Sequence, residues 1–134
     1  MKVRDVMSRE VKTLRRNDAL DLADQLMKMN RIRHLVVLDD DEDRVAGVVS
    51  QRDLFLGALA RALGYGSAGA YKVMATLVVK EVMASEPVTI EPDAPLADAA
   101  RIMLESKIGC LPVVDGDRLV GIVTESDFVR LAAS

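Results

Sequence analysis

The sequence contains few aromatic residues, one cysteine and one histidine, and each shortage excludes a class of core or site. Trp is absent and aromatic residues make up only 3% of the chain, so the hydrophobic core must consist of aliphatic side chains and methionine. A single cysteine excludes an internal disulfide. One cysteine and one histidine are too few for a conventional zinc site, so we expect no metal site and no resident cofactor.

Long apolar runs and a strong net charge are also lacking. No apolar run approaches the roughly 20 residues that cross a bilayer, and Met1 is not followed by a charged and then apolar leader. We therefore expect a cytoplasmic protein. The net charge of −3 gives no attraction to nucleic acid or to an anionic membrane, so we expect neither as a partner. Phosphate-binding glycine loops and nucleophile motifs are missing, and we expect no enzymatic activity.

The most informative feature that is present is an internal repeat. It matches Val3, Val6, Met7, Thr13, Leu20, Ala23, Met27, Ile32, Leu35, Val37 and Asp39 with Val79, Val82, Met83, Thr89, Leu96, Ala99, Met103, Ile108, Leu111, Val113 and Asp115. It then matches Gly47, Val49, Ser50 and Asp53 with Gly121, Val123, Thr124 and Asp127. Two copies are too few for a solenoid. We expect two related units that pack around a pseudo-two-fold axis, with ligand clefts between them.

Apolar periodicity and turn residues predict the same order of elements in each copy. In the first copy it predicts strands at 11–14, 34–38 and 45–49, a helix capped by Asn17 or Asp18, and a helix from Ser50 to about Leu63. In the second copy it predicts strands at 87–90, 110–114 and 119–123, a helix capped by Asp93, and a helix from Thr124. A polar turn is expected at 39–44, and a hairpin turn is expected at 115–117.

The predicted fold class is therefore α/β (α+β), with two β-α-β-β-α repeats packed with pseudo-two-fold symmetry. We predict a first domain at 1–63, a linker at 64–78 and a second domain at 79–134. Proline cannot donate a ladder hydrogen bond, so we expect the backbone before Val113, at Pro112, to face a cleft and not a neighbouring strand.

Three sequence stretches carry a resemblance to a known family. They are Ile108–Asp115, Gly47–Asp53 and Gly121–Asp127, and all are in register with the repeat. On these motifs the chain resembles a CBS-domain pair (tandem CBS domains, or Bateman module) over almost its whole length. The resemblance implies a regulatory module without catalytic activity. Its implied ligands contain adenosine, namely AMP, ADP, ATP or S-adenosylmethionine. One departure is Val36, which stands where the second copy has Pro112.

The resemblance also implies ligand contacts. Adenine would lie beside the first strand and the start of the second strand of one copy, while the other copy supplies the residues that bind ribose. One cleft would use Lys12, Thr13 and Ile32, with Arg33 and His34 for phosphate, and Thr124 and Asp127 for ribose. The other cleft would use Val88, Thr89, Ile108, Gly109 and Cys110, with Ser50 and Asp53 for ribose. Because only the first copy has the basic pair, we expect the two clefts to differ in phosphate affinity.

Each of these residues also has a structural interpretation. A Ser or Thr followed three residues later by Asp is a helix-start pattern, so Ser50 and Thr124 could serve as caps. Thr13 and Thr89 fit ordinary strand positions. Arg33 and His34 could form a solvated edge, and Cys110 is expected to be a buried small hydrophobe. Capping and ligand binding can coexist, and both interpretations stay open from the sequence.

Two functions follow from these alternatives. The first is a sensor of adenosine-containing nucleotides that signals through an unidentified effector protein or an oligomer. The second is a structural dimerisation module with vestigial ligand sites. We expect a homodimer in either case, because the last helices and the linker carry apolar residues that one pair does not fully cover. These residues are Leu54, Phe55, Leu59, Phe128, Val129 and Leu131.

Overall fold

The chain forms two compact units, and each unit combines segments that are distant in the sequence. The computed structural model describes residues 1–65 and 77–134. The first-repeat unit contains Lys12–Glu42 and Ala46–Glu86, and the second-repeat unit contains Met1–Val11, Asp43–Val45 and Pro87–Ser134. Most of the predicted linker 64–78 lies outside the described residues. The mixed α/β class is confirmed.

The first-repeat unit is built on a four-stranded sheet with the order β1-β2-β3-β4. Its elements are β1 (Thr13–Arg15), α1 (Leu20–Asn30), β2 (His34–Leu38), β3 (Val45–Ser50), α2 (Gln51–Tyr65), η3 (Val79–Glu81) and β4 (Ala84–Ser85). Strand β1 runs parallel to β2, and β3 runs antiparallel to β4. The predictions for β2, β3 and α2 are confirmed to within two residues, and β1 lies one to two residues later than expected.

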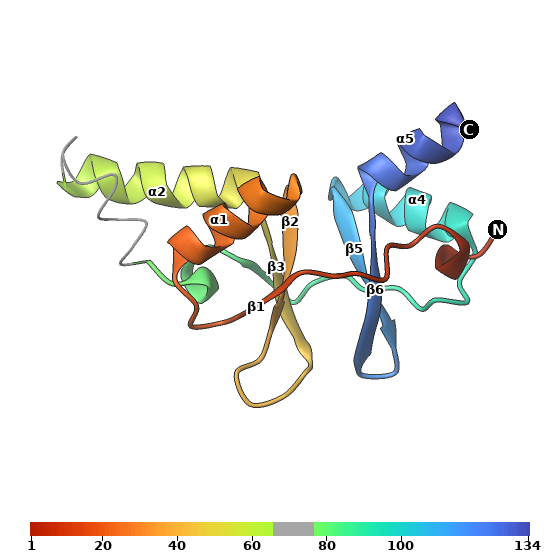
Figure 1. Cartoon of the computed structure of the whole chain (residues 1–134), viewed down its shortest axis with the longest axis horizontal. Helices are drawn as coiled ribbons and strands as arrows, with labels where there is room; N and C mark the ends of the chain where they lie inside the picture. Colours follow the sequence, from red (N-terminus) through yellow and green to blue (C-terminus); the bar gives the residue numbers. More distant parts are fainter. Residues whose placement is uncertain (66–76) are drawn as a thin grey trace. The chain divides into compact units, whose positions relative to one another are not determined.

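The second-repeat unit is built on the hairpin of β5 and β6, drawn in blue in Figure 1. Its elements are η1 (Val3–Asp5), α4 (Leu96–Ser106), β5 (Cys110–Asp115), β6 (Arg118–Thr124) and α5 (Glu125–Ala133). Asp115 pairs with Arg118, so the turn consists of two residues, and Gly116 adopts a φ of 64°. Glycine reaches that left-handed conformation without a steric penalty, and the predicted hairpin is confirmed.

The repeated apolar positions form the two cores. Helix α1 buries Leu20, Ala23 and Met27, and α4 buries Leu96, Ala99 and Met103 at the same spacing. These residues lie three and four positions apart, so they share one helix face. In the strands the matched buried residues are Leu35 and Leu111, Val37 and Val113, and Val49 and Val123.

The segment before the first strand of each repeat packs on the other repeat's unit. The first residues of the chain bond to the second repeat, with Val3 N–H donating to the Ala94 carbonyl at 2.9 Å. Reciprocally, Val79 N–H donates to the Asp18 carbonyl at 2.9 Å. Val3 and Val79 are both fully buried, in the second-repeat and first-repeat cores respectively. The compact units are therefore interleaved along the sequence.

Gly47 and Gly121 occupy matching positions of the two repeats and let another segment approach closely. We call the segment before the first strand of each repeat, which packs on the other repeat's unit, the exchanged segment. A Cβ placed on Gly47 would lie 2.7 Å from the Ala84 carbonyl oxygen, and a Cβ on Gly121 would lie 2.9 Å from the Ser8 carbonyl oxygen. Real Cβ atoms do not approach so closely. Glycine is therefore needed where the exchanged segment runs against β3 or β6.

The predicted helix caps are wrong. The N-cap positions are Ala19 and Pro95, and neither makes a side-chain capping bond. Asp18 instead accepts from the Arg15 backbone N–H at 2.7 Å, and Asp93 pairs with Arg4. Both carboxylates are thus engaged just before the helix. The helix N–H of Leu20 donates instead to the Leu77 carbonyl at 2.8 Å, so the exchanged segment takes part of the role of a cap.

The predicted strand at 87–90 is also wrong, because only Ile90 pairs, through one parallel bridge to Val113. This bridge also corrects the prediction for Pro112, whose carbonyl oxygen accepts from the Ile90 N–H at 3.1 Å. Pro112 lies within β5 opposite Ile122. Its backbone therefore faces a neighbouring segment, and the missing proline donor interrupts only a short pairing.

Both core helices end at a basic residue in the left-handed conformation. Arg31 and Lys107 have φ of 54°, and their N–H groups donate to the carbonyls of Met27 and Met103. Glycine or asparagine usually fills this position because other side chains crowd the backbone there. The strain recurs at matched positions of the two repeats.

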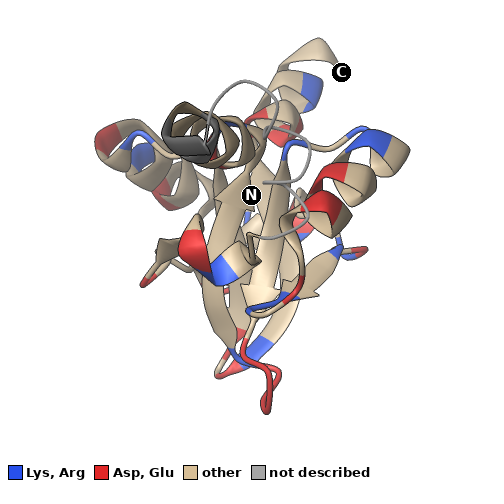
Figure 2. Cartoon of the chain, turned by 90° about the vertical axis from the view of Figure 1, so that its left-hand side faces the viewer, with Lys and Arg blue, Asp and Glu red and all other residues tan. Residues whose placement is uncertain are grey.

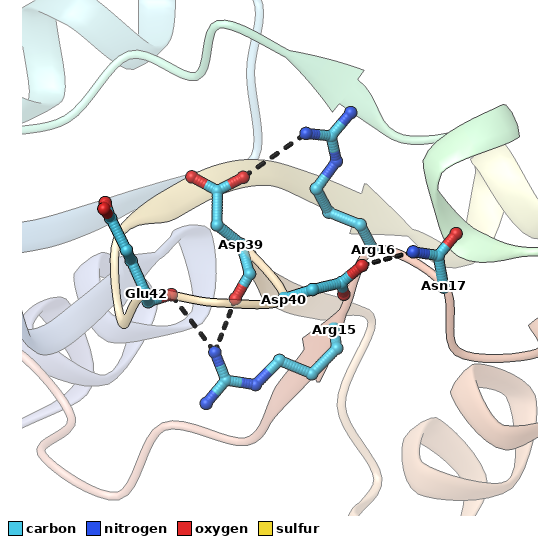
Figure 3. A network of polar contacts seen from close by, with 6 residues as sticks. All are labelled: Arg15, Arg16, Asn17, Asp39, Asp40 and Glu42. Atoms are coloured by element: carbon cyan, nitrogen blue, oxygen red, sulfur yellow. Dashed lines mark hydrogen bonds and ion pairs between the residues drawn. The ribbon is translucent and has the colours of Figure 1, made fainter.

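The predicted polar turn at 39–44 is confirmed as a loop, and it is held by Arg15 of β1 and by Arg16, which follows the strand and pairs with Asp39. Figure 2 shows acidic residues, in red, along the loop between β2 and β3 at the bottom of the view. The Arg15 guanidinium donates to the backbone carbonyls of Asp39 at 2.6 Å and Glu42 at 3.1 Å (Figure 3). Asn17 also donates to Asp40. The loop is therefore fixed through its backbone as well as through its charges.

Candidate functional site

The start of α2 holds a serine and an aspartate in a reciprocal cap. The Ser50 backbone N–H donates to Asp53 Oδ2 at 2.8 Å, and the Asp53 N–H donates to Ser50 Oγ at 3.1 Å. Both residues are half-buried. The capping interpretation of this pair is therefore confirmed, and the orientation of Asp53 is fixed.

The start of α5 repeats this arrangement with a threonine. The Thr124 N–H donates to Asp127 Oδ2 at 2.8 Å, and the Thr124 hydroxyl donates to the same oxygen at 3.4 Å. Asp127 is 6% exposed and is the one buried polar or charged residue among the described part of the chain. Its other oxygen, Oδ1, accepts from Arg130 Nη2 at 2.8 Å. A nearly buried carboxylate is thus held on both oxygens.

Each helix start is tied to the start of the second strand of its own repeat. The Gln51 N–H donates to the Arg33 carbonyl at 2.8 Å, and the Glu125 N–H donates to the Gly109 carbonyl at 3.2 Å. The structure therefore joins the backbone of Arg33 to the start of α2, and the backbone of Gly109 to the start of α5. The predicted groupings across the repeats stay a prediction.

The predicted first-strand residues are exposed. Thr13 begins β1 opposite Val36, with Lys12 just before it, and both side chains are exposed. In the second repeat Val88 is 43% exposed, and exposed Thr89 lies outside any strand. Strand propensity alone therefore does not account for Thr89. These side chains leave apolar and hydroxyl surface open to a ligand.

The predicted residues at the second strand differ in their access to solvent. Ile32 and Ile108 are half-buried and pack against the cores of their own units, while Cys110 is 5% exposed. The expectation that Cys110 is a buried small hydrophobe is confirmed. Arg33 is exposed and His34 is half-buried at the first residue of β2. The basic pair therefore keeps one side chain accessible.

The chemistry offered by each helix start is polar binding. A fixed carboxylate accepts hydrogen bonds from vicinal hydroxyls, and a helix N-terminus favours a nearby anion. No group of three or more His, Cys, Asp or Glu that could hold a metal lies in the part of the chain that the structure describes. Among residues 1–65 and 77–134, no helix is long and apolar enough to span a membrane.

The comparison with protein families matches both repeats. The model of the CBS domain matches residues 3–58 and 79–134. The chain belongs to the CBS-domain family. A CBS domain-containing protein of Dictyostelium discoideum is 33% identical over 130 residues, which cover 96% of this chain and 89% of that protein.

Solved structures of CBS pairs share the fold over nearly the whole chain. A Vibrio cholerae protein named for acetoin utilization (AcuB) gives a TM-score of 0.82 at 38% identity, covering 99% of this chain and 90% of that one. The CBS pair of protein MJ0100, in complex with 5′-methylthioadenosine and S-adenosyl-L-methionine, gives 0.79 at 27% identity, with coverage of 99% and 96%. CBSX2 in complex with AMP gives 0.77 at 31% identity, with coverage of 98% and 96%.

Sequence reasoning missed one polar residue of this CBS pair, Arg130. It lies three residues after Asp127 on the same helix, and acid–base pairs at that spacing meet on a helix surface. The spacing was visible in the sequence. The second repeat therefore carries a charge partner for its capping aspartate, and the first repeat has Leu56 at the matching position.

Proposed function

We propose that this chain is a regulatory module that senses adenosine-containing ligands, namely AMP, ADP, ATP or S-adenosylmethionine. The module has no catalytic step of its own. Ligand occupancy passes a signal to an oligomer or to an unidentified effector protein. We propose that the protein is cytoplasmic, because these ligands occur in the cytoplasm.

The observation that carries the proposal is the duplicated helix start. Asp53 and Asp127 are each oriented by a backbone N–H at 2.8 Å. A preoriented carboxylate binds the two hydroxyls of a ribose with little loss of side-chain entropy. The same helix start presents backbone N–H groups and a positive dipole toward a phosphate. Capping and ribose binding are thus compatible roles for one aspartate.

Related CBS pairs support the choice of ligand class. The MJ0100 pair is in complex with 5′-methylthioadenosine and S-adenosyl-L-methionine, and CBSX2 is in complex with AMP. Those ligands share adenosine and differ in charge. We infer that adenosine is the common element that this chain recognises.

We propose that each ligand contacts both repeats. In the first proposed site the base lies by Thr13 and Ile32, and the ribose lies by Asp127. In the second the base lies by Thr89 and Ile108, and Asp53 binds the ribose. Aliphatic side chains would cover the faces of adenine, since the chain has few aromatic residues.

Thermal unfolding with added ligand tests this function. A ligand that binds only the folded state must raise the melting temperature, and the rise should grow with ligand concentration above Kd. AMP, ADP, ATP, S-adenosylmethionine and adenosine are compared with guanosine as the control. Mass spectrometry of molecules released from the purified protein identifies the natural ligand. Absence of any shift with all five adenosine compounds would refute the proposal.

A dimerisation module with vestigial sites is the second candidate, and exposed apolar residues on α2 favour it. Phe55 is 66% exposed, Leu59 is 44% exposed and Leu63 is 79% exposed. Leu54, which we expected on the same surface, is instead 3% exposed and belongs to the first-repeat core. Apolar surface of this kind is typical of an interface, so we propose a homodimer under either function.

Light scattering of the wild type and of Phe55→Asp tests the dimer. The wild type should have twice the monomer mass at micromolar concentration, and the variant should shift toward the monomer. Leu104→Asp is the matched control, because Leu104 is 79% exposed on α4 and lies outside the proposed interface. A dimer without ligand shifts would favour the second function.

A further inference from the structure

The two capping aspartates differ in charge compensation. Asp127 accepts from Thr124 N–H through Oδ2 and from Arg130 through Oδ1, each at 2.8 Å. The Asp127 side chain is 7% exposed, whereas the Arg130 side chain is 72% exposed. The pair thus joins a nearly buried carboxylate to a guanidinium that reaches solvent.

Asp53 has no such partner. Its Oδ2 accepts from Ser50 N–H, and within residues 1–65 and 77–134 no hydrogen bond or ion pair engages its Oδ1. The residue three positions later is Leu56, which is 48% exposed and has no charge. The two helix starts therefore have the same type of cap, while only Asp127 is paired with a positive charge.

This difference changes which ligands each carboxylate tolerates. An anionic phosphate near Asp53 meets an uncompensated negative charge, which repels it. Near Asp127 the two charges cancel, and the guanidinium offers further donors suited to phosphate oxygens. Within the described residues Arg130 bonds to Asp127 Oδ1 alone, so most of its donors are open to solvent or a ligand.

We propose that Arg130 is a specificity-determining residue, which makes the Asp127 site accept phosphorylated adenosine ligands, while Leu56 leaves the Asp53 site to neutral or cationic ones. This inference rests on the proposed function. The cap of α5 does not require Arg130, because Thr124 N–H already bonds to the other oxygen of Asp127. The arginine is therefore available to respond to the ligand.

Calorimetry with adenosine, AMP and ATP tests the assignment on the full chain. An Asp53→Ala background isolates the Asp127 site. There, Arg130→Leu, which copies the first repeat, should weaken AMP and ATP binding about tenfold, the value of one charged hydrogen bond. Adenosine affinity should stay within about twofold. Arg130→Lys should keep most of the preference for phosphate because it keeps the charge.

The reciprocal change provides a second measurement. In an Asp127→Ala background, Leu56→Arg should raise the affinity of the Asp53 site for AMP relative to adenosine. Equal losses for adenosine and ATP in Arg130→Leu would overturn the inference, and so would unchanged binding of both. If the unmodified chain binds none of adenosine, AMP, ADP, ATP and S-adenosylmethionine, the proposed function itself fails and the inference fails with it.

Discussion

The backbone N–H of Gln51 donates a 2.8 Å hydrogen bond to the carbonyl oxygen of Arg33. This bond joins the first residue of α2 to the residue before β2. Under the proposed function, Asp53 beside Gln51 belongs to one ligand site and Arg33 belongs to the other. A ligand that moves either Arg33 or the start of α2 also moves the other through this hydrogen bond. We therefore expect binding at the two sites to be coupled.

Removing either capping carboxylate should weaken binding at one site. Asp53→Ala and Asp127→Ala each remove a preoriented acceptor, so affinity for adenosine should fall on the order of tenfold to a hundredfold at that site. Isothermal titration calorimetry measures both stoichiometry and affinity. Ser50→Ala is the comparison variant for the Asp53 site, because it removes the Asp53 N–H to Ser50 Oγ bond and keeps the carboxylate, so it isolates the contribution of the carboxylate. Wild-type affinity in both aspartate variants would make the motif a cap alone.

The exposed guanidinium of Arg33 should bind the phosphate groups of the ligand. Arg33→Ala should weaken ATP and ADP binding more than adenosine binding, by on the order of tenfold, and raised salt should reduce the difference. Arg101→Ala changes the net charge equally on exposed α4 and serves as the control. Equal losses for adenosine and ATP in Arg33→Ala would show that the arginine supports the fold.

Gly121 should tolerate no side chain. A Cβ there would lie 2.6 Å from Met7 Sδ and 2.9 Å from the Ser8 carbonyl oxygen, so Gly121→Ala forces the exchanged segment away from β6. We expect a loss of roughly 1–3 kcal/mol in unfolding free energy, measured by urea denaturation. Ser126→Ala on the exposed surface of α5 should change it by less than about 0.5 kcal/mol. A neutral Gly121→Ala would disprove the close approach.

Relief of the strained helix end should stabilise the protein. Lys107 has a φ of 54°, which glycine adopts freely, so Lys107→Gly should raise the unfolding free energy by about 0.5–1 kcal/mol. Glu105→Gly, two residues earlier within α4, should lower it by a similar amount because glycine weakens a helix interior. Thermal melts of both variants against the wild type separate the two effects. Destabilisation by both would contradict a strained Lys107.

Acid should remove the contribution of one ion pair. The hydrogen bond from Arg4 holds the pKa of Asp93 below its ordinary value of 3.8, with Lys2 adding attraction. A lowered pKa stabilises the fold above the ordinary value, and this contribution is lost as pH falls through the lowered pKa. Asp93→Asn should therefore be less stable than the wild type at pH 7, with the difference shrinking as pH falls through the lowered pKa of Asp93. Denaturation at stepped pH measures this, and a constant difference would refute it.

The repeat allowed much of the fold to be predicted, because matched apolar positions such as Leu35 and Leu111 must occupy matched cores. It could not show which unit receives Val3 or Val79, since periodicity relates equivalent residues and does not pair segments. The cap predictions were wrong because Asp18 accepts from the Arg15 backbone N–H and Asp93 pairs with the Arg4 side chain.

The candidate sites were predictable in part. The Ser50 and Thr124 patterns located both carboxylates, whereas the charge difference between them depends on Arg130 and its contact with Asp127. The left-handed ends of α1 and α4 carried no glycine or asparagine signal, since they use Arg31 and Lys107. Tertiary packing sets those two backbone angles.

Val3 is buried in the second-repeat core and Val79 in the first-repeat core, and this limits the order in which the protein can fold during synthesis. Val3 leaves the ribosome first, but Leu111, Val113 and Val123 of its core arrive more than a hundred residues later. The first-repeat core also waits for Val79. Neither half of the chain, cut at the middle, would carry its complete core. We therefore expect the two repeats to fold as one cooperative unit, although each resembles an independent domain in sequence.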